Sequence, residues 1–318
     1  EKIKMATYLT SNATGLREDL RDTIMRVDPA ETPLVSNLTI ETVNAVTHEW
    51  LVQELASASD TNHANEGADF SFVNPTATTR LTNVCQIAVQ AVAVSNTLET
   101  VDKAGRDREM AYVSVIKGLE QKRDINKSLY KNEAKSSSDP RKCGKLITYL
   151  TNGSKPSDGG FATGDGSDTA DLTLTARALT LALIDEAMLS AYTDGGNPSV
   201  MFMSPTNKQN FSDLSSGSVA TNQITMTAPT DITIVGSASI FLTDFGELAV
   251  VTDRVCPDSE IYLVDTDHVC LGYLKDRSFK QSDVSPTGDA LKSAIVSEYT
   301  LIPKAPKAHA VIIGLNGS

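Results

Sequence analysis

The sequence predicts an α+β protein with an extended shape, and three observations lead to this fold class. First, the stretch from Val101 to Lys135 contains no proline and ends in a densely charged helical register. A helix of about 30 residues would be about 45 Å long, which is too long to pack inside one compact core. Second, strand-like sequence lies on both sides of this stretch. Third, two alternating segments before it flank a small polar stretch, which predicts a β-hairpin that projects from the body.

The composition is that of a folded protein and disfavours a nucleic-acid reader. The chain has 318 residues, of which 40% are hydrophobic and 21% are charged, which suits one large domain or two joined domains. The net charge of −12 disfavours a surface that grips phosphate groups. If the protein meets DNA at all, we expect it to contain the DNA rather than to read its sequence. No apolar run approaches the roughly 18 residues of a membrane span, and no signal-peptide pattern begins the chain. We therefore expect no membrane partner and no secretion.

The first part of the chain is interpreted as an arm followed by the hairpin. Residues 7–38 are polar and rich in turn formers, with one short helical register. Apolar and polar residues alternate over 46–55, where the only tryptophan, Trp50, occurs. Residues 56–67 are small and polar, and the sequence becomes extended again over 70–81. Two arms of about ten residues each would make a hairpin about 33 Å long.

The middle of the chain alternates between strands and helices. Residues 82–96 predict a strand ahead of the long helix, and 152–168 form a Gly/Ser/Asp-rich loop that we expect to face solvent or a neighbouring subunit. Residues 172–192 predict a helix with Thr173 or Thr175 as its N-cap.

The last part of the chain predicts mainly strands. Ser204 is expected to cap a short helix that has Pro205 at its first position and runs to about Leu214. The apolar runs predict strands at 200–203, 232–235, 239–243, 248–255, 261–264, 294–301 and 308–315.

The sequence carries no motif of a known catalytic or metal site. GxSxG, GxxxxGK[ST], HExxH and GxGxxG are all absent, and the four histidines are far apart. The nearest thing to a cluster is His268 with Cys270, Asp265 and Asp267, which we interpret as a turn after a strand. Residues 164–168 lack the spacing and the terminal glutamate of a calcium loop and are interpreted as a flexible loop. We predict no catalytic residue, no cofactor and no metal, and we expect the four cysteines, which lack CxxC spacing, to be reduced and buried.

The order of these parts resembles the tailed-phage major capsid proteins of the Hong Kong 97 fold. Short phrases of the sequence are also similar to one branch of that family: GLREDL at 15–20, PAETP at 29–33, GGNP at 195–198 and KAHA at 307–310. The resemblance implies an N-arm at 1–39, an extended β-hairpin loop at 40–81, a peripheral domain with a long spine helix at 82–136 and 286–318, and an axial domain at 137–285.

The resemblance also implies a structural function without enzymatic activity. Such a protein self-assembles, as pentamers and hexamers, into the icosahedral shell of a virion that encloses a double-stranded DNA genome without recognising its sequence. The implied partners are portal, scaffolding and possible decoration proteins, and assembly would take place in the host bacterial cytoplasm. Some members form a crosslink between a lysine of the extended loop and a neighbour, but this chain has no lysine between Lys4 and Lys103. We therefore expect a shell without that crosslink.

The hairpin carries the candidate contacts between subunits. Trp50, Phe70 and Phe72 are the candidate anchors, because aromatic residues dominate interface energetics. The alternative is that they pack within the base of their own hairpin. Three other functions stay open: an encapsulin-like bacterial compartment shell, a tail or adhesion protein, and an enzyme of a new type.

Overall fold

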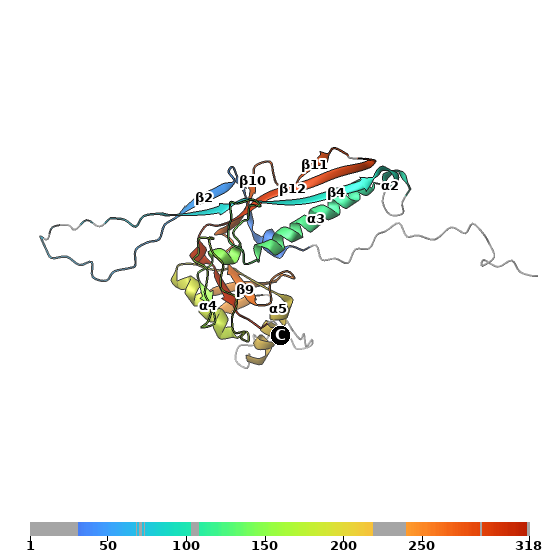
Figure 1. Cartoon of the computed structure of the whole chain (residues 1–318). Helices are drawn as coiled ribbons and strands as arrows, with labels where there is room; N and C mark the ends of the chain where they lie inside the picture. Colours follow the sequence, from blue (N-terminus) through green and yellow to red (C-terminus); the bar gives the residue numbers. More distant parts are fainter. Residues whose placement is uncertain are drawn as a thin grey trace, which may run out of the picture.

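The protein has three parts (Figure 1). They are an elongated part, which we call the arm and which is distinct from the expected N-arm at 1–39, a compact domain beside the arm, and a long loop that projects from one end of the arm. The computed structural model describes residues 31–316 except 68, 70, 71, 73, 103–107, 219–239 and 287. The short helix predicted within 7–38 and the strand predicted at 232–235 therefore lie outside the described residues.

The elements follow one another along the chain in this order. They are α1 (Pro33–Asn37), β1 (Thr39–Val43), β2 (Thr47–Val52), β3 (Thr79–Val84), β4 (Gln86–Ser95), α2 (Asn96–Thr100), α3 (Glu109–Leu129), η2 (Leu146–Tyr149), β5 (Gly153–Ser154), α4 (Leu181–Thr193), β6 (Val200–Met203), α5 (Pro205–Ser218), β7 (Ile240–Thr243), β8 (Gly246–Thr252), β9 (Glu260–Val264), β10 (Val269–Leu274), β11 (Lys280–Val284), β12 (Ala290–Pro303), η3 (Pro306–Ala308) and β13 (Ala310–Ile313).

The arm is built on a five-stranded sheet with the long strand β12 at its centre. Strand β4 runs antiparallel along one side of β12, and β10 and β11 follow each other along the opposite side, with β1 parallel to β10. Helix α3 lies along β4 and β12, where the Gln121 side chain donates to the Ala88 carbonyl at 2.8 Å. Ile125 and Leu129, the predicted apolar stripe of its second half, are buried against the body.

Helix α3 is shorter than the sequence predicted. It has 21 residues, which makes it about 32 Å long rather than about 45 Å. The charged register up to Lys135 is not helical, because other parts of the chain take its hydrogen bonds. The Lys135 N–H donates to the Gly166 carbonyl at 2.8 Å, and its Nζ donates to the Thr82 carbonyl at 3.0 Å.

The compact domain is built on a six-stranded sheet in the order β5-β13-β9-β6-β8-β7. The predicted strand 200–203 is confirmed as β6, which is buried on both faces: Phe202 packs in one core cluster, and Met201 and Met203 pack in the other. Ser204 caps α5 as expected, since its Oγ accepts from the Asn207 N–H at 3.2 Å.

The predicted start of α4 is wrong. The helix begins after Thr180 rather than at Thr173 or Thr175, so the predicted helix at 172–192 is realised only from Leu181. The hydroxyls of Thr173 and Thr175 donate instead to Asp171 and Asp158, at 2.6 Å and 2.8 Å. These bonds hold the chain ahead of α4 in an irregular loop.

The two sheets do not separate at residue 286, the domain boundary that the resemblance implies. Two strands without a clear sequence signal, β10 and β11, join β12 in the arm, and β13 returns to the six-stranded sheet. β1, assigned to the extended loop, also belongs to the sheet of the arm. Strand periodicity identifies a strand but not the sheet that it joins, so the sheet membership of β1, β10, β11 and β13 could not be predicted from the sequence.

The remaining local predictions concern cysteines and acidic loops. All four cysteines, Cys85, Cys143, Cys256 and Cys270, are free and buried, as expected. His268 lies in a turn after β9, with its Nδ1 2.8 Å from the Asp265 carboxylate, which confirms the interpretation as a turn. In the loop at 164–168, the Asp165 carboxylate accepts hydrogen bonds from the hydroxyls of Thr163 and Ser167.

Candidate assembly surfaces

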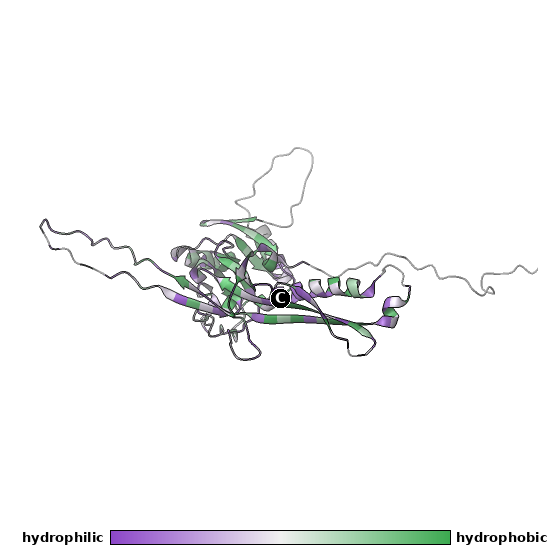
Figure 2. Ribbon diagram, turned by 90° about the horizontal axis from the view of Figure 1, so that it is seen from above, coloured by the Kyte–Doolittle hydropathy of each residue, from purple (hydrophilic) through white to green (hydrophobic). Residues whose placement is uncertain are grey.

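The most exposed apolar side chains of the described chain lie on the projecting loop between β2 and β3, residues 53–78. Leu55 is 97% exposed and Phe72 is 94% exposed. The hairpin ladder runs only from Thr47 opposite Val84 to Val52 opposite Thr79, so the expected long ribbon is a short ribbon with an irregular loop. Figure 2, seen from above, shows the loop extending well beyond the folded body. A loop of this shape leaves apolar surface in water unless another molecule covers it.

The projecting loop is also strongly acidic. It carries Glu54, Asp60, Glu66 and Asp69, and no lysine or arginine. Glu54 of the loop forms an ion pair with Lys307 of the body, at 2.8 Å. The loop therefore presents negative charge together with apolar side chains.

The two candidate anchors that the structure describes, Trp50 and Phe72, have different surroundings. Trp50 packs at the base of the hairpin, with its ring 6.0 Å from Tyr149 and beside the buried Val43 and Cys85. The ring therefore contacts the base of the hairpin and also Tyr149, which lies outside the hairpin. Phe72 lies on the loop and is 94% exposed, and Phe70 lies outside the described residues. Contacts of these residues with a neighbouring subunit stay predictions.

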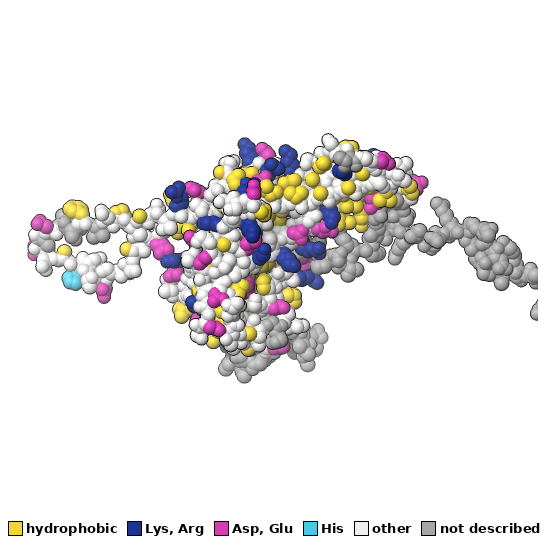
Figure 3. Space-filling model, in the orientation of Figure 1, with side chains coloured by type: hydrophobic (Ala, Val, Ile, Leu, Met, Phe, Trp, Pro, Cys, Tyr) yellow, Lys and Arg dark blue, Asp and Glu magenta, His cyan; other side chains and the backbone are white. Residues whose placement is uncertain are grey.

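A second apolar surface, which we call the outer face, covers the side of the arm sheet opposite α3. Ile87 and Val89 of β4 are 45% and 54% exposed, whereas Gln90 points toward α3 and donates to Asp124 at 2.9 Å. Figure 3 shows a band of hydrophobic side chains along the arm. The cross-strand neighbours that continue the outer face are Ala91, Ala294 and Val296, with Lys280 opposite Val296 on β11 and Lys292 opposite Ala93 on β4.

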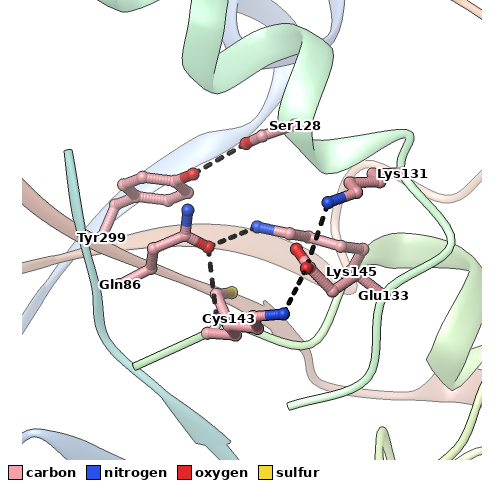
Figure 4. Close-up of polar contacts among 8 residues, drawn as sticks. Gln86, Ser128, Lys131, Glu133, Cys143, Lys145 and Tyr299 are labelled. Carbon is pink, nitrogen blue, oxygen red and sulfur yellow. Dashed lines mark hydrogen bonds and ion pairs between the residues drawn. The ribbon is translucent and has the colours of Figure 1, made fainter. Parts of the chain in front are cut away.

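A polar junction fixes the end of α3 to the arm sheet and to the segment that leads into the compact domain (Figure 4). Lys145 is fully buried and donates to the Gln86 side chain at 2.6 Å. Burial lowers the pKa of the Lys145 ammonium, with the neighbouring Cys143 and Glu133 opposing the shift. The other contacts of the junction are Ser128 with Tyr299 at 2.7 Å, and Glu133 with Lys131 and Lys142 at 3.1 Å each. Nothing in the local sequence marks Lys145 as buried, so this residue was missed.

A second polar network ties α3 to the six-stranded sheet. The Asp253 carboxylate after β8 accepts from Asn126 at 2.7 Å and from the Tyr130 hydroxyl at 3.1 Å. Asn126 in turn accepts from the Val35 N–H of α1 at 3.0 Å. The two networks together connect the arm to the compact domain.

Glu260, on β9, makes the stability of the folded protein depend on pH. Its buried carboxyl group shares a short hydrogen bond with the Tyr262 hydroxyl, and burial raises its pKa from 4.5 to about 7. The folded protein therefore holds this proton more tightly than the unfolded chain. The stabilisation is complete below pH 4.5 and is lost as the pH rises through 7.

We expect Glu260→Gln to flatten the pH dependence of stability. The wild-type protein loses about 3 kcal/mol of unfolding free energy from this group between pH 4.5 and 8, whereas glutamine stays neutral. Urea unfolding at pH 5 and pH 8 measures the difference between the two proteins. Parallel pH profiles would show that Glu260 ionises in the fold as it does in the unfolded chain.

Neither a metal cluster nor a membrane-spanning helix is found among the described residues. Within them, no group of three or more His, Cys, Asp or Glu side chains could hold a metal ion. None of the helices that the structure describes is both long enough and apolar enough to cross a membrane. The notable surfaces of the chain are thus the projecting loop and the outer face.

Solved structures with the same architecture include phage capsid proteins and an encapsulin. The capsid subunit of cyanophage A-1(L) superposes with a TM-score of 0.66 at 16% identity, covering 96% of this chain and 98% of the other. A structure from Mycobacterium phage Adephagia gives 0.59 at 11% identity, covering 98% of each chain. The SrpI encapsulin of Synechococcus elongatus PCC 7942 gives 0.57 at 12% identity, covering 96% of this chain and 97% of the other. These likenesses establish the fold, which is that of Hong Kong 97-type shell proteins.

Sequence similarity leads to the phage capsid proteins in particular. The major capsid protein of Escherichia phage Phieco32 is 31% identical over 129 residues, which span 41% of this chain and 37% of that protein. The family model of the SU10 major capsid proteins matches residues 4–316, nearly the whole sequence. The chain therefore belongs to the SU10 major capsid protein family.

Proposed function

We propose that copies of this chain assemble, as pentamers and hexamers, into the closed icosahedral shell of a tailed phage. The observation that carries the proposal is the projecting loop, whose Leu55 and Phe72 are almost fully exposed and have no apolar partner within the described chain. Each loop would lie over a neighbouring subunit, so that every copy gives one such contact and receives one. In the terms used for this fold, residues 1–39 would be the N-arm. The part built on the five-stranded sheet would be the peripheral domain, and the part built on the six-stranded sheet would be the axial domain.

The outer face is the surface that we propose receives the loop. It offers Ile87 and Val89 to the apolar side chains of the loop, and Lys280 to its carboxylates. Charge complementarity of this kind fixes the orientation of partners as they meet. The contact would therefore weaken at high salt.

The remaining partners follow from the same function. The shell would enclose double-stranded DNA without reading it, which agrees with a net charge of −12. Portal, scaffolding and decoration proteins would act with it in the host cytoplasm, and the chain itself would catalyse no reaction.

An encapsulin-like compartment is the alternative function, supported by the TM-score of 0.57 to the encapsulin of Synechococcus. That likeness concerns the fold, whereas the match over residues 4–316 favours the phage family. The contents of the assembled particles distinguish the two functions, because a compartment holds cargo protein and a capsid holds DNA.

Electron microscopy and sedimentation of the purified full-length chain, and of particles from infected cells, test the proposal. We expect closed shells, and particles from infected cells that contain DNA. We also expect denaturing gels of these particles to show single subunits, since the loop has no lysine to form a covalent ladder. A protein that stays monomeric at all concentrations would refute the assembly, and a ladder would refute the absence of a crosslink.

A further inference from the structure

Two connections between the sheets run side by side. The chain passes from β9 in the six-stranded sheet to β10 in the arm through residues 265–268, and from β12 in the arm to β13 through 304–309. The Lys304 N–H donates to the His268 carbonyl at 2.7 Å, which joins the two connections directly. A change at this point acts on both passages between the sheets at once.

The second bond between the two connections is made by a buried histidine. His309 has 0% exposure, and its Nδ1 accepts from the Asp265 N–H at 3.0 Å. A ring nitrogen that accepts carries no proton, so the imidazole is neutral with its proton on Nε2. Within the described residues, that Nε2 is buried without a hydrogen-bond partner.

The charged groups around this histidine come from both connections. The Asp265 carboxylate is 2.8 Å from the Nδ1 of His268 and also accepts from the Asp267 N–H at 3.0 Å. Burial lowers the pKa of His309 to about 4, and the neighbouring His268 lowers it further, while the Asp265 carboxylate and the His268 backbone oppose the shift. Two more ion pairs attach the second connection to its surroundings: Lys304 with Glu41 of β1 at 3.2 Å, and Lys307 with Glu54 of the projecting loop at 2.8 Å.

We propose that His309 is a proton-operated lock between the arm and the compact domain. A proton taken up from solvent would occupy Nδ1, which would then face the Asp265 N–H as a second donor and could no longer accept from it. The two connections would separate at this point while each sheet keeps its own strand pairing. Because the second connection also holds Glu54 through Lys307, the release would reach the base of the projecting loop.

The lowered pKa of His309 means that acid weakens the contact between the two connections. The folded pKa of about 4 lies below the ordinary 6.5, so the opened state binds the proton more tightly. The lock is at full strength above pH 6.5 and weakens as the pH falls toward 4. Between pH 7 and pH 4, the range of the experiment below, the opening equilibrium of the wild-type protein should rise by about 100-fold.

Hydrogen exchange of the full-length chain between pH 7 and pH 4 tests the lock, with rates corrected for the intrinsic effect of pH. The reporters are the amides of Asp265 and Lys304, which donate across the two connections. The matched variant is His309→Asn, whose side-chain oxygen can accept in place of Nδ1 but does not titrate. We expect the protection of both amides to fall steeply with acid in the wild-type protein and to stay level in the variant.

Three results would overturn the lock. The first is the same loss of protection in the wild-type protein and in His309→Asn. The second is a parallel loss at the amides of β6 and β12, which would mean that the whole chain unfolds. The third is an ordinary pKa near 6.5 for His309 in the wild-type protein, which would exclude a protected neutral ring. Hydrogen exchange at the imidazole C2 measures this pKa, and it needs no variant, so it also serves if His309→Asn fails to fold.

Discussion

Replacing residues 53–78 by an Asn-Gly turn should abolish shell formation and leave a folded subunit. Val52 and Thr79 are the last paired residues of the ribbon, so a two-residue turn can close the hairpin at this point. The ion pair between Glu54 of the loop and Lys307 of the body joins two exposed side chains, and such a pair contributes little stability. Each subunit would lose one donated and one received contact. Sedimentation should then show subunits or small oligomers where the wild-type protein forms shells.

A double substitution, Leu55→Ser with Phe72→Ser, separates the apolar contact from the mere presence of the loop. Burial of each of these side chains contributes about 1.5–3 kcal/mol, so their loss should raise the concentration needed for assembly by a factor of about 100 or more. The matched control is Asn62→Ser with Asn65→Ser, which changes the same loop without removing apolar surface. Normal shells from the double serine variant would show that the loop does not hold neighbouring subunits together.

Gly153→Ala should unfold the compact domain or destabilise it by about 3 kcal/mol or more. Gly153 has a φ of +139° in the two-residue strand β5, and a Cβ added there would lie 1.8 Å from the Val311 carbonyl oxygen. The clash is with backbone, which cannot turn away as a side chain does. Since Val311 lies in β13, in the interior of the six-stranded sheet, the strain would act on the core itself.

Gly118→Ala is the control for this substitution, with an effect of opposite sign. Gly118 lies inside α3, and the nearest atom to its added Cβ is the Ile295 Cδ1 at 4.0 Å. Alanine there should stabilise the helix by about 0.5–1 kcal/mol. Guanidinium unfolding midpoints of the two variants measure both effects. A Gly153→Ala protein with a wild-type midpoint would mean that β5 can leave the sheet without loss.

The parts of the fold that could be predicted are those with strong periodicity or an unambiguous cap. The run at 200–203 and the Ser204–Pro205 helix start were read correctly, because burial on both faces and capping leave local signals. The GGNP phrase has a physical explanation as well. The N–H groups of Gly195 and Gly196 donate to the carbonyls of Tyr192 and Ala191, which closes α4, and a Cβ at Gly196 would lie 2.5 Å from Ala308.

The parts that failed depend on contacts between distant segments. Nothing near Lys135 reveals that Gly166, on another loop, takes its backbone N–H in place of a helical partner. The burial of Lys145 against Gln86 is hidden for the same reason. Of the anchors, Phe72 could be predicted as exposed because it lies in a polar segment, whereas the packing of Trp50 against Tyr149 joins segments that are far apart in the sequence.

The position of β13 has a consequence for how the subunit is made. Residues 310–313 are inserted between β5 and β9, so the six-stranded sheet stays incomplete until they have left the ribosome. A nascent chain that has already formed β9 would carry an open strand edge throughout the synthesis of β10 to β12. Nascent copies crowded on one messenger RNA would expose that edge to one another, which favours either a chaperone at this stage or rapid translation of the last segment.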